Sequence, residues 1–521
     1  MTLIVIDSKP LESPTIDDAA AINRQLCAII AFTMSTKDAQ NPAETAETAI
    51  YPTRTDVEMA PITLAPKSND RESFIVAFAE PHDSENPKQW PDRQKWAVTN
   101  VLSATGFNRI MVSTIMAPAL PLIAAELNMN PTEAAMSLSI YLLATAFGPL
   151  LIGPLSELYG RRVVLHSSNI WFLIWNIVCG FATTKGTLIA ARLFAGLGAS
   201  SIYALAGGVL GDVWRPEQRG RSLGIYLVVP LVAVAVGPII GGFMTSRASW
   251  RWMFWSTSIF QALMVVFCLT TFRETYAPTI LKRRAAKLRR ETGRSYQTLD
   301  ERNDRHRSIF MILCTNLSRP LRLLACNPVI QASSLISAFN YGILYIVLSS
   351  FAELYSVHYH QSIEISGLHY IACAAGEIVG SQLGGPLMDI LYRRMVARSA
   401  DGEHQPEFRL PLVIPGAVLG PLGLFVYGWT AEHLVHWAAV DTGIFFFMAG
   451  TQIAGMPMQA YFPRSLAAFL FPLFAPSMYS ALGYGWGNTT IAFVGLCLGI
   501  LSPFLLWVFG PRLRKKLYWV Y

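Results

Sequence analysis

The chain has 521 residues, of which 52% are hydrophobic and 14% are charged, and its formal net charge is +7. A soluble protein carries charge on about a quarter of its residues, so this composition excludes an ordinary water-exposed surface. The basic excess could indicate nucleic acid binding, but the apolar stretches carry no base-reading motif beside them, and we predict no nucleic acid partner. The seven cysteines form no CxxC or Cys/His spacing, so packed thiols are expected and a metal site is not.

Residues 1–95 are polar and contain 15 acidic and 9 basic residues. A segment of this composition cannot bury a core, so we predict a disordered cytosolic tail. It ends where Trp90 and Trp96 would reach the membrane interface.

Apolar stretches of roughly 20 residues, the length that a helix needs to cross a bilayer, then recur about twelve times. We place them at 96–120, 134–155, 163–182, 188–213, 222–245 and 252–272, and after a polar interruption at 328–351, 365–388, 410–429, 437–461, 466–482 and 489–510. The prediction is an all-α polytopic membrane protein with two six-helix bundles, over 96–272 and 328–510. A central loop over 273–327 joins them, and a cytosolic tail over 511–521 follows.

A short charged turn after the second stretch is repeated after the eighth. GPLSELYGRR, from Gly153 to Arg162, returns as GPLMDILYRR, from Gly385 to Arg394. The repetition predicts that one membrane-embedded half occurs twice, with each copy placing this turn on the same side of the bilayer.

The charged turn is predicted to latch neighbouring helices together in one state and to part in another. Glu157 precedes Arg161 by four residues, so the two can pair if the helix continues. The proposed latch residues are Gly153, Glu157, Gly160, Arg161 and Arg162, with Gly385, Asp389 and Arg393 in the second copy. The alternative is that these residues serve only as topology anchors.

The fifth stretch contains a dense group of small residues, Gly237, Pro238, Gly241 and Gly242. Missing side chains allow close helix packing, and Pro238 removes a backbone donor, which bends a helix. We predict a tightly packed, bent helix that acts as a pivot and a seal.

Basic residues are distributed unevenly among the turns that connect the predicted spans. They gather at alternate turns, in the central loop and at the C-terminus, whereas the opposite turns hold only Lys185, Arg247 and Arg251. This asymmetry predicts both termini in the cytosol. The central loop has 13 basic and 5 acidic residues between Arg273 and Arg322, and is interpreted as an amphipathic linker on anionic lipid, with a regulatory binding segment as the alternative.

Charged residues inside the predicted spans are candidates for function because burying them costs free energy. Glu377 could load and release a proton, or could be a hydrogen-bonded packing residue. Arg109 must face a cavity, a carboxylate or backbone carbonyls, and is a candidate for contact with the substrate. The other candidates for lining a substrate cavity, each of which could equally be a packing residue, are Tyr141, Tyr226, Asn340, Tyr341 and Tyr345.

Several blocks together resemble the Major Facilitator Superfamily, and within it the twelve-helix fungal drug:proton antiporters. They are the turn at Gly153 to Arg162, Arg192 in LIAARLFAGLG, the block from Gly237 to Gly242, SWRWMFW, FRETYAPTIL, NYGILY and PEFRLP. The resemblance covers the chain from about Ser84 to the end. It implies a role for Arg192 in proton coupling and for the block in the fifth stretch in preventing leak.

The chain departs from this family in two places. Leu158 stands where the superfamily often has a basic residue, and residues are missing around Met458 to Ser465. The second departure predicts a shortened eleventh helix.

The resemblance implies a non-enzymatic transporter that exports small amphiphilic compounds in exchange for protons, by alternating access, without a cofactor. The expected partners are a small-molecule substrate, protons and the lipid bilayer, and the expected state is a monomer in the cell membrane. The alternatives are a proton-coupled importer or facilitator of a polar nutrient, and a membrane-bound enzyme or receptor. No HExxH, GxSxG or nucleotide-binding loop favours an enzyme.

Overall fold

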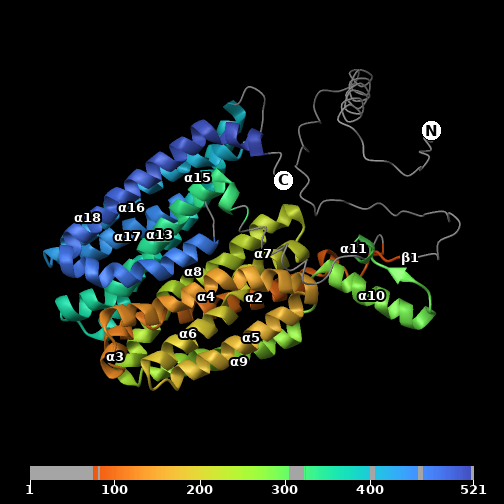
Figure 1. Cartoon of the computed structure of the whole chain (residues 1–521), viewed down its shortest axis with the longest axis horizontal. Coiled ribbons are helices and arrows are strands. Elements are labelled where there is room, and N and C mark those ends of the chain that lie inside the picture. Colours follow the sequence, from red (N-terminus) through yellow and green to blue (C-terminus); the bar gives the residue numbers. More distant parts are fainter. Residues whose placement is uncertain are drawn as a thin grey trace. The chain divides into compact units, whose positions relative to one another are not determined.

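Figure 1 shows the computed structural model of the chain, which describes residues 74–79, 82–303, 322, 324–398, 405–455 and 461–517. Within these residues every long element is a helix, and the two short strands, β1 (Phe74–Ile75) and β2 (Tyr296–Gln297), pair in parallel. By length and apolarity, nine helices of this described part could cross a bilayer, and one of them, Phe462–Pro511, contains two of the predicted stretches. The predicted all-α polytopic class is confirmed.

The N-terminal half follows the six predicted stretches. Its elements are α2 (Asp92–Thr114), η2 (Ala117–Ala119), α3 (Leu120–Glu126), α4 (Pro131–Tyr159), α5 (Arg161–Gly180), α6 (Lys185–Ala199), α7 (Ser201–Val213), α8 (Pro216–Arg247) and α9 (Arg251–Thr271). Local chemistry sets the boundaries: Asn130 and Glu133 form a capping box at the start of α4, and the Thr184 side chain caps α6.

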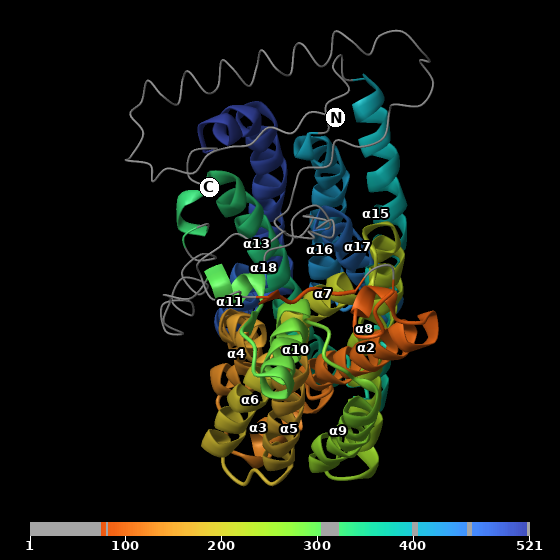
Figure 2. The same ribbon diagram turned by 90° about the vertical axis from the view of Figure 1, so that its right-hand side faces the viewer.

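The central loop begins with a basic helix, α10 (Ala277–Thr292), and continues through β2 to α11 (Leu299–Asn303). Figure 2 shows α10 in front of the N-terminal helices, with α11 close to it. Gly293 ends α10 in the left-handed region, with φ 68°, as is usual for a glycine after a helix.

The C-terminal half follows the same order. Its elements are α13 (Pro328–Glu353), η3 (Leu354–His358), α14 (Ile363–Leu368), α15 (Tyr370–Arg398), η4 (Pro406–Leu412), α16 (Val413–Glu432), α17 (Trp437–Gly455) and α18 (Tyr461–Leu517). α18 contains the eleventh and twelfth stretches, and Gly483, with φ 69° and ψ 178°, separates them. The eleventh helix therefore begins at Tyr461, five residues before the predicted start, and it is not shortened as expected.

The end of the N-terminal tail is anchored rather than disordered. α2 begins at Asp92, and the segment before it contains η1 (Pro87–Gln89), capped by Asn86. Arg284 on α10 donates to both carboxylate oxygens of Asp83, at 2.7 and 2.9 Å, and to Glu85, while β1 pairs with β2. The sequence did not predict this contact because the two segments are far apart in the chain. Residues 1–73 of the predicted tail lie outside the described residues.

Replacing Asp83 with Asn is expected to release this anchor. The Arg284 hydrogen bonds hold the pKa of Asp83 well below its usual value of 3.8. The ionised carboxylate therefore stabilises the contact fully above pH 3.8, and this stabilisation is lost only as the pH falls below 3.8. A charge-assisted hydrogen bond contributes roughly 1.5–3 kcal/mol, so amide exchange in residues 82–90 should accelerate about tenfold or more at pH 7. Protection in the unmodified protein should stay constant from pH 8 to 5, and Asp92→Asn is the matched control. Loss of protection at pH 5 would contradict this assignment.

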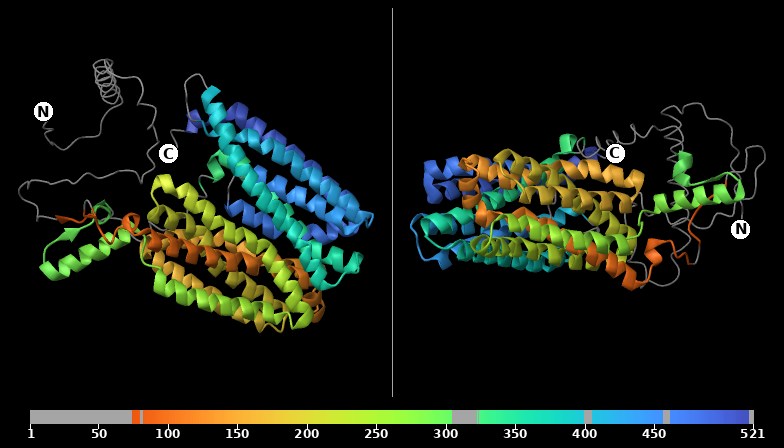
Figure 3. Two further views of the ribbon diagram at one scale, coloured as in Figure 1. Left: turned by 180° about the vertical axis from the view of Figure 1, so that it is seen from behind. Right: turned by 90° about the horizontal axis from the view of Figure 1, so that it is seen from below.

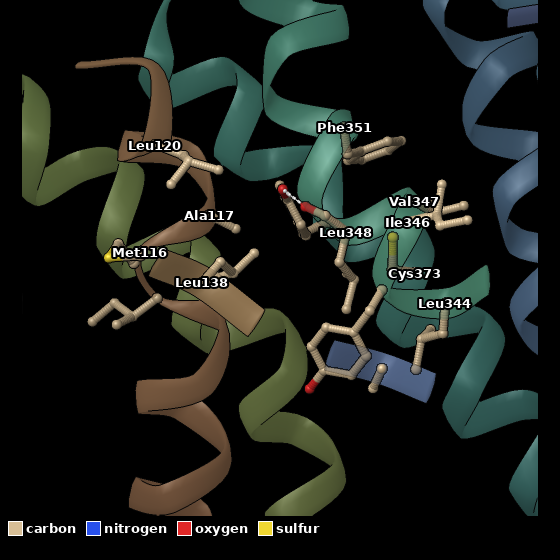
Figure 4. Close-up of a cluster of buried hydrophobic side chains, with 14 of the residues drawn as sticks. Met116, Ala117, Leu120, Leu138, Leu344, Ile346, Val347, Leu348, Phe351 and Cys373 are labelled. Atoms are coloured by element: carbon tan, nitrogen blue, oxygen red, sulfur yellow. Dashed lines mark hydrogen bonds between the residues drawn. The ribbon is translucent and has the colours of Figure 1, made fainter. Parts of the chain in front are cut away.

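The two halves form separate groups of helices that meet along a shared buried core. Figure 3 shows α2 to α9 on one side and α13 to α18 on the other. One buried cluster contains residues of both, and Figure 4 shows Met116, Ala117 and Leu120 of the N-terminal half together with Leu348 and Phe351 of α13. η2 and α3 meet α13 here, α8 meets α14 and α15, and α4 meets α18.

Candidate functional site: the region between the two helical halves

Arg192 of α6 lies inside the N-terminal half and is 0% exposed. Its guanidinium donates to three backbone carbonyls, those of Val112 at 2.8 Å and of Ser137 and Leu138 at 3.3 Å. It also lies over the ring of Tyr141, 4.7 Å from the ring centroid. Among the described residues it forms no ion pair, so backbone dipoles and an aromatic face stabilise the cation and join α2, α4 and α6.

Arg109 of α2 is equally buried, among N-terminal helices. It donates to the carbonyl of Gly198 and to the side-chain oxygen of Asn169, and it lies 4.4 Å from the ring centroid of Phe172. The backbone carbonyl of Arg109 accepts a 2.9 Å hydrogen bond from Tyr141, which thereby contacts both buried arginines. The sequence left three environments open for Arg109: a cavity, a carboxylate or backbone carbonyls. In the structure its guanidinium contacts a backbone carbonyl and, in addition, the side-chain amide oxygen of Asn169. Arg109 and Tyr141 are both buried in this conformation, and their contact with substrate stays a prediction.

Glu377 lies on α15 of the C-terminal half and is 8% exposed. It makes no hydrogen bond or ion pair with any described residue, and Arg464 of α18 is the cation that acts on it electrostatically. Arg464 in turn lies over the ring of Tyr341, 4.2 Å from its centroid. An ionised carboxylate without a partner is costly to bury in an apolar span, so this environment favours a proton-binding role over that of a hydrogen-bonded packing residue, and the role of Glu377 in proton coupling stays a prediction.

Tyr345 brings the two predicted proton-coupling residues into one region. This α13 side chain lies near Arg192 of the N-terminal half and near Glu377 of its own half. Tyr203 of α7 lies near Tyr341, Tyr345 and Arg464, again across the two halves. Sequence reasoning missed Tyr203 and Arg464, because neither stands in a family block and only the fold places them opposite Tyr345.

Two other predicted cavity residues lie elsewhere. Tyr226 of α8 is buried in a cluster within the N-terminal half, where its carbonyl accepts a hydrogen bond from Ser103. Asn340 is half-buried on α13. Neither is brought into the tyrosine-lined region by a described contact.

The small residues of α8 form two close contacts on different faces of one helix. A Cβ atom on Gly237 would lie 2.9 Å from the carbonyl oxygen of Met111, and one on Gly241 would overlap the carbonyl oxygen of Ile115, so this face lies against α2 of the same half. Gly242 instead lies against Ile363 and Gly367 of α14, and Pro238 presents its carbonyl to Gly367. The helix therefore has one face in the N-terminal half and one at the contact between the halves.

The comparisons with known proteins agree with this arrangement. Residues 102–467 match the Major Facilitator Superfamily. The chain belongs to this superfamily. It is 49% identical over 421 residues to "Probable efflux pump mfs2" of Aspergillus flavus, covering 77% of this chain and 99% of that one, and 37% identical over 481 residues to "Efflux pump vrtL" of Penicillium aethiopicum, covering 88% and 95%.

Solved structures of the Major Facilitator Superfamily support the fold. The D-xylose–proton symporter aligns with a TM-score of 0.59 at 16% identity, covering 79% of this chain and 97% of the symporter. A bacterial homologue of the human lysosomal transporter Spinster, in an inward-facing conformation, aligns with a TM-score of 0.55, covering 83% and 99%. At this identity the likeness concerns the fold alone.

The charged turn of this superfamily member forms a cluster around Arg161, but with a different acid from the one predicted. Gly160 has φ 95° and breaks the helix between Glu157 and Arg161, so the pairing that required a continuous helix does not form. Arg161 instead pairs with Asp212 of α7 at 3.1 Å and lies over the ring of Tyr276. Glu274, after α9, accepts hydrogen bonds from the backbone amides of Arg161 and Arg162. Asp212 and Glu274 were missed because they lie in other parts of the sequence.

The second copy of the turn has a different geometry. α15 runs without interruption from Tyr370 to Arg398, because Tyr392 stands where the first copy has Gly160, and a tyrosine does not favour positive φ. Asp389 and Arg393 are exposed on it and make no ion pair with any described residue. Gly153 and Gly385 have open space beside them. The repeat is therefore conserved in sequence between the halves, while only the first copy forms a closed cluster here.

Asp212→Asn is expected to loosen the cluster around Arg161. The side chains of Arg161 and Asp212 are 11% and 23% exposed, and removing one member of a well-buried pair costs roughly 3–5 kcal/mol, so a loss of about 2 kcal/mol is expected at this partly exposed site. The measurement is the denaturation midpoint of the purified full chain. Glu157→Gln is the comparison variant and should cost less. An equal or larger effect of Glu157→Gln would identify Glu157 as the more important acid.

Proposed function

We propose that this protein is a secondary active transporter that exports small amphiphilic organic compounds, such as a drug, toxin or secondary metabolite, in exchange for protons. The observation that carries the proposal is the buried Glu377 carboxyl, in the predicted eighth span, which makes no hydrogen bond or ion pair with a described residue and lies near Tyr345 of α13. It can bind a proton at a place where the two halves face each other. The names of the relatives, which are efflux pumps of filamentous fungi, support export as the direction.

The region between the halves suits a largely apolar cargo. Tyr203, Tyr341 and Tyr345 offer aromatic faces with hydroxyl groups, Arg464 offers a positive charge, and Glu377 offers a carboxyl group that can gain or lose a proton. Such a surface recognises cargo by area and shape, with few directional contacts. An amphiphile with one polar group satisfies it better than a hydrated sugar does.

The described contacts support a state closed at the end of α3 and α14. η2 and α3 meet α13 there, and α8 meets α14, whereas the described residues include no comparable contact between α7 and α17. The distribution of basic turns assigns the opposite end, with Arg161 and α10, to the cytosol. The protein would then be a monomer of the cell membrane with both termini in the cytosol, open to the cytosol in this state.

The test is transport in sealed inside-out vesicles that contain the full chain. Uptake of a fluorescent amphiphile should increase severalfold when the lumen is made acidic, and should return to its basal rate when an ionophore removes the gradient. Uptake that ignores the imposed gradient would exclude proton antiport. Gradient-driven release in place of uptake would favour an importer.

A further inference from the structure

A histidine-centred cluster lies at the α14 end of the C-terminal half, away from the region described above. His369 stands between α14 and α15 and is 7% exposed. Its Nδ1 is 2.7 Å from Oδ2 of Asp441 on α17, and its Nε2 is 2.7 Å from Oε1 of Gln361. The imidazole stacks on the ring of Tyr355, with centroids 3.7 Å apart and planes inclined by 4°.

The carboxylate of Asp441 is satisfied on both oxygens. Oδ1 accepts a 2.7 Å hydrogen bond from the hydroxyl group of Tyr355, and Oδ2 faces His369. The cluster therefore connects three elements, η3, the start of α15 and α17. A cavity of about 560 Å³ borders it, lined by Gln361, Ile365, Leu368, His369, Ile371, Ala372, Trp437 and Asp441. A proton can reach the imidazole from this cavity.

The geometry suits a protonated imidazole. Both ring nitrogens face oxygen atoms, and imidazolium has two N–H donors where neutral imidazole has one. Imidazole is also the side chain that changes charge between pH 5 and 8. Loss of the proton leaves one of the two nitrogens without a hydrogen to donate, which weakens the link between the elements.

Among the described residues, Asp441 is the carboxylate that contacts His369. Tyr355 and Tyr359 approach from η3 and the turn after it, and Cys373, one turn along α15, faces Asp441 and Tyr355. On the α17 side Trp437 contacts His369, and His436 lies beyond it. Glu364 of α14 points away, toward Ser246 and Arg247 of α8.

The cluster is next to the contact that closes the two halves. His369 directly follows α14, and Gly367 of α14 lies against Gly242 and the Pro238 carbonyl of α8. A change in the hydrogen bonds of His369 therefore acts on the segment that holds α8. No sequence motif marks His369, because Asp441 is 72 residues away and Gln361 and Tyr355, which precede it by 8 and 14 residues, lie before the start of α14.

We infer that His369 and Asp441 form a proton-binding site at the extracytosolic end of the C-terminal half, where a bound proton stabilises the closed contact between α14 and α8. Proton binding itself follows from the cluster. Its use in coupled transport rests on the proposed function, so the two are tested separately.

Thermal unfolding of the full chain in detergent tests proton binding. His369→Gln should lower the Tm more at pH 6 than at pH 8, with the two losses differing by about 2 °C or more. In an Asp441→Asn background the same substitution should cost the same at both pH values. The control is His358→Gln on η3, whose exposed side chain should give equal effects at both pH values. Equal losses for His369→Gln in the unmodified background would overturn the site.

A second variant covers the case in which His369→Gln does not fold. Gln361→Glu places a carboxylate at Nε2 and should favour the bound proton. The folded state then keeps its proton at pH values where the unfolded state has lost it, so the fall in Tm from pH 6 to 8 should become larger than in the unmodified protein. An unchanged or smaller fall would count against the site.

Transport tests the use of the proton. In vesicles, His369→Gln should lose gradient-driven uptake about tenfold while exchange of labelled for unlabelled amphiphile stays within about twofold. Equal loss of both activities would indicate a structural role and overturn the coupling role. If the unmodified protein itself ignores the gradient, the proposed antiport fails, and the unfolding result still decides whether the proton site exists.

Discussion

Gly241→Leu is expected to abolish transport while leaving the protein inserted in the membrane. A Cβ atom at this position would overlap the carbonyl oxygen of Ile115, so α8 cannot remain against α2 unless one of the two backbones moves. Overpacking of this kind costs typically about 1–3 kcal/mol, and the displaced helix is also the one that contacts α14. We expect a loss of uptake of at least tenfold in the vesicle assay, with expression reduced by less.

Gly224→Leu on the same helix is the matched control. No atom lies within 4 Å of a Cβ at Gly224, so a leucine there should be tolerated. The two substitutions add the same side chain to the same helix and differ in what it meets. Equal transport by the two variants would show that close packing at Gly241 has no part in the transport cycle, and the predicted pivot would be wrong.

The glycine block illustrates what sequence can predict. A dense group of small residues indicates close approach whatever the partner is, because the missing side chain is the signal. Which partner approaches could not be read, since α2 and α14 are distant in sequence and lie on different faces of α8. The helices themselves were predictable for the same reason: apolar length and capping residues such as Asn130 are local properties.

Ion-pair partners were less predictable than helices. The four-residue spacing predicted an ion pair between Arg161 and Glu157. The positive φ of Gly160 interrupts the helix between them, and Arg161 pairs with Asp212 instead. A positive φ at glycine can be suspected from the residue type and is established only by the surrounding fold. Likewise Arg284 pairs with Asp83 across 201 residues, and no local pattern marks either residue.

The buried arginines show how a correct local inference can leave the role open. A guanidinium in a span must find oxygen atoms, and both Arg109 and Arg192 do so on backbone carbonyls. The sequence could not say that Tyr141 would contact both, or that Tyr345 would lie between Arg192 and Glu377. The position of Tyr345 near Arg192 depends on how the two halves pack against each other, which no local sequence pattern specifies.

Glu377→Gln is expected to uncouple transport from the proton gradient. Glutamine keeps the size and polarity of the side chain but cannot ionise, and an ionised carboxylate at the centre of a span costs roughly 2.5–3.5 kcal/mol on insertion scales, so the variant should fold at least as well. We expect gradient-driven uptake to fall tenfold or more and the remaining uptake to be the same from pH 6 to pH 8.

The exchange assay and a surface control separate coupling from damage. Glu377 makes no hydrogen bond with a described residue that the substitution would remove, so exchange of labelled for unlabelled amphiphile should persist in Glu377→Gln. Glu353→Gln, which removes an exposed carboxylate at the end of α13, should leave both uptake and its pH dependence unchanged. Gradient-driven uptake at the unmodified level in Glu377→Gln would remove this residue from proton coupling. The cluster of His369 and Asp441 would then be the remaining proton site described in the C-terminal half, and Tyr345 would connect Arg192 to a residue that serves cargo binding alone.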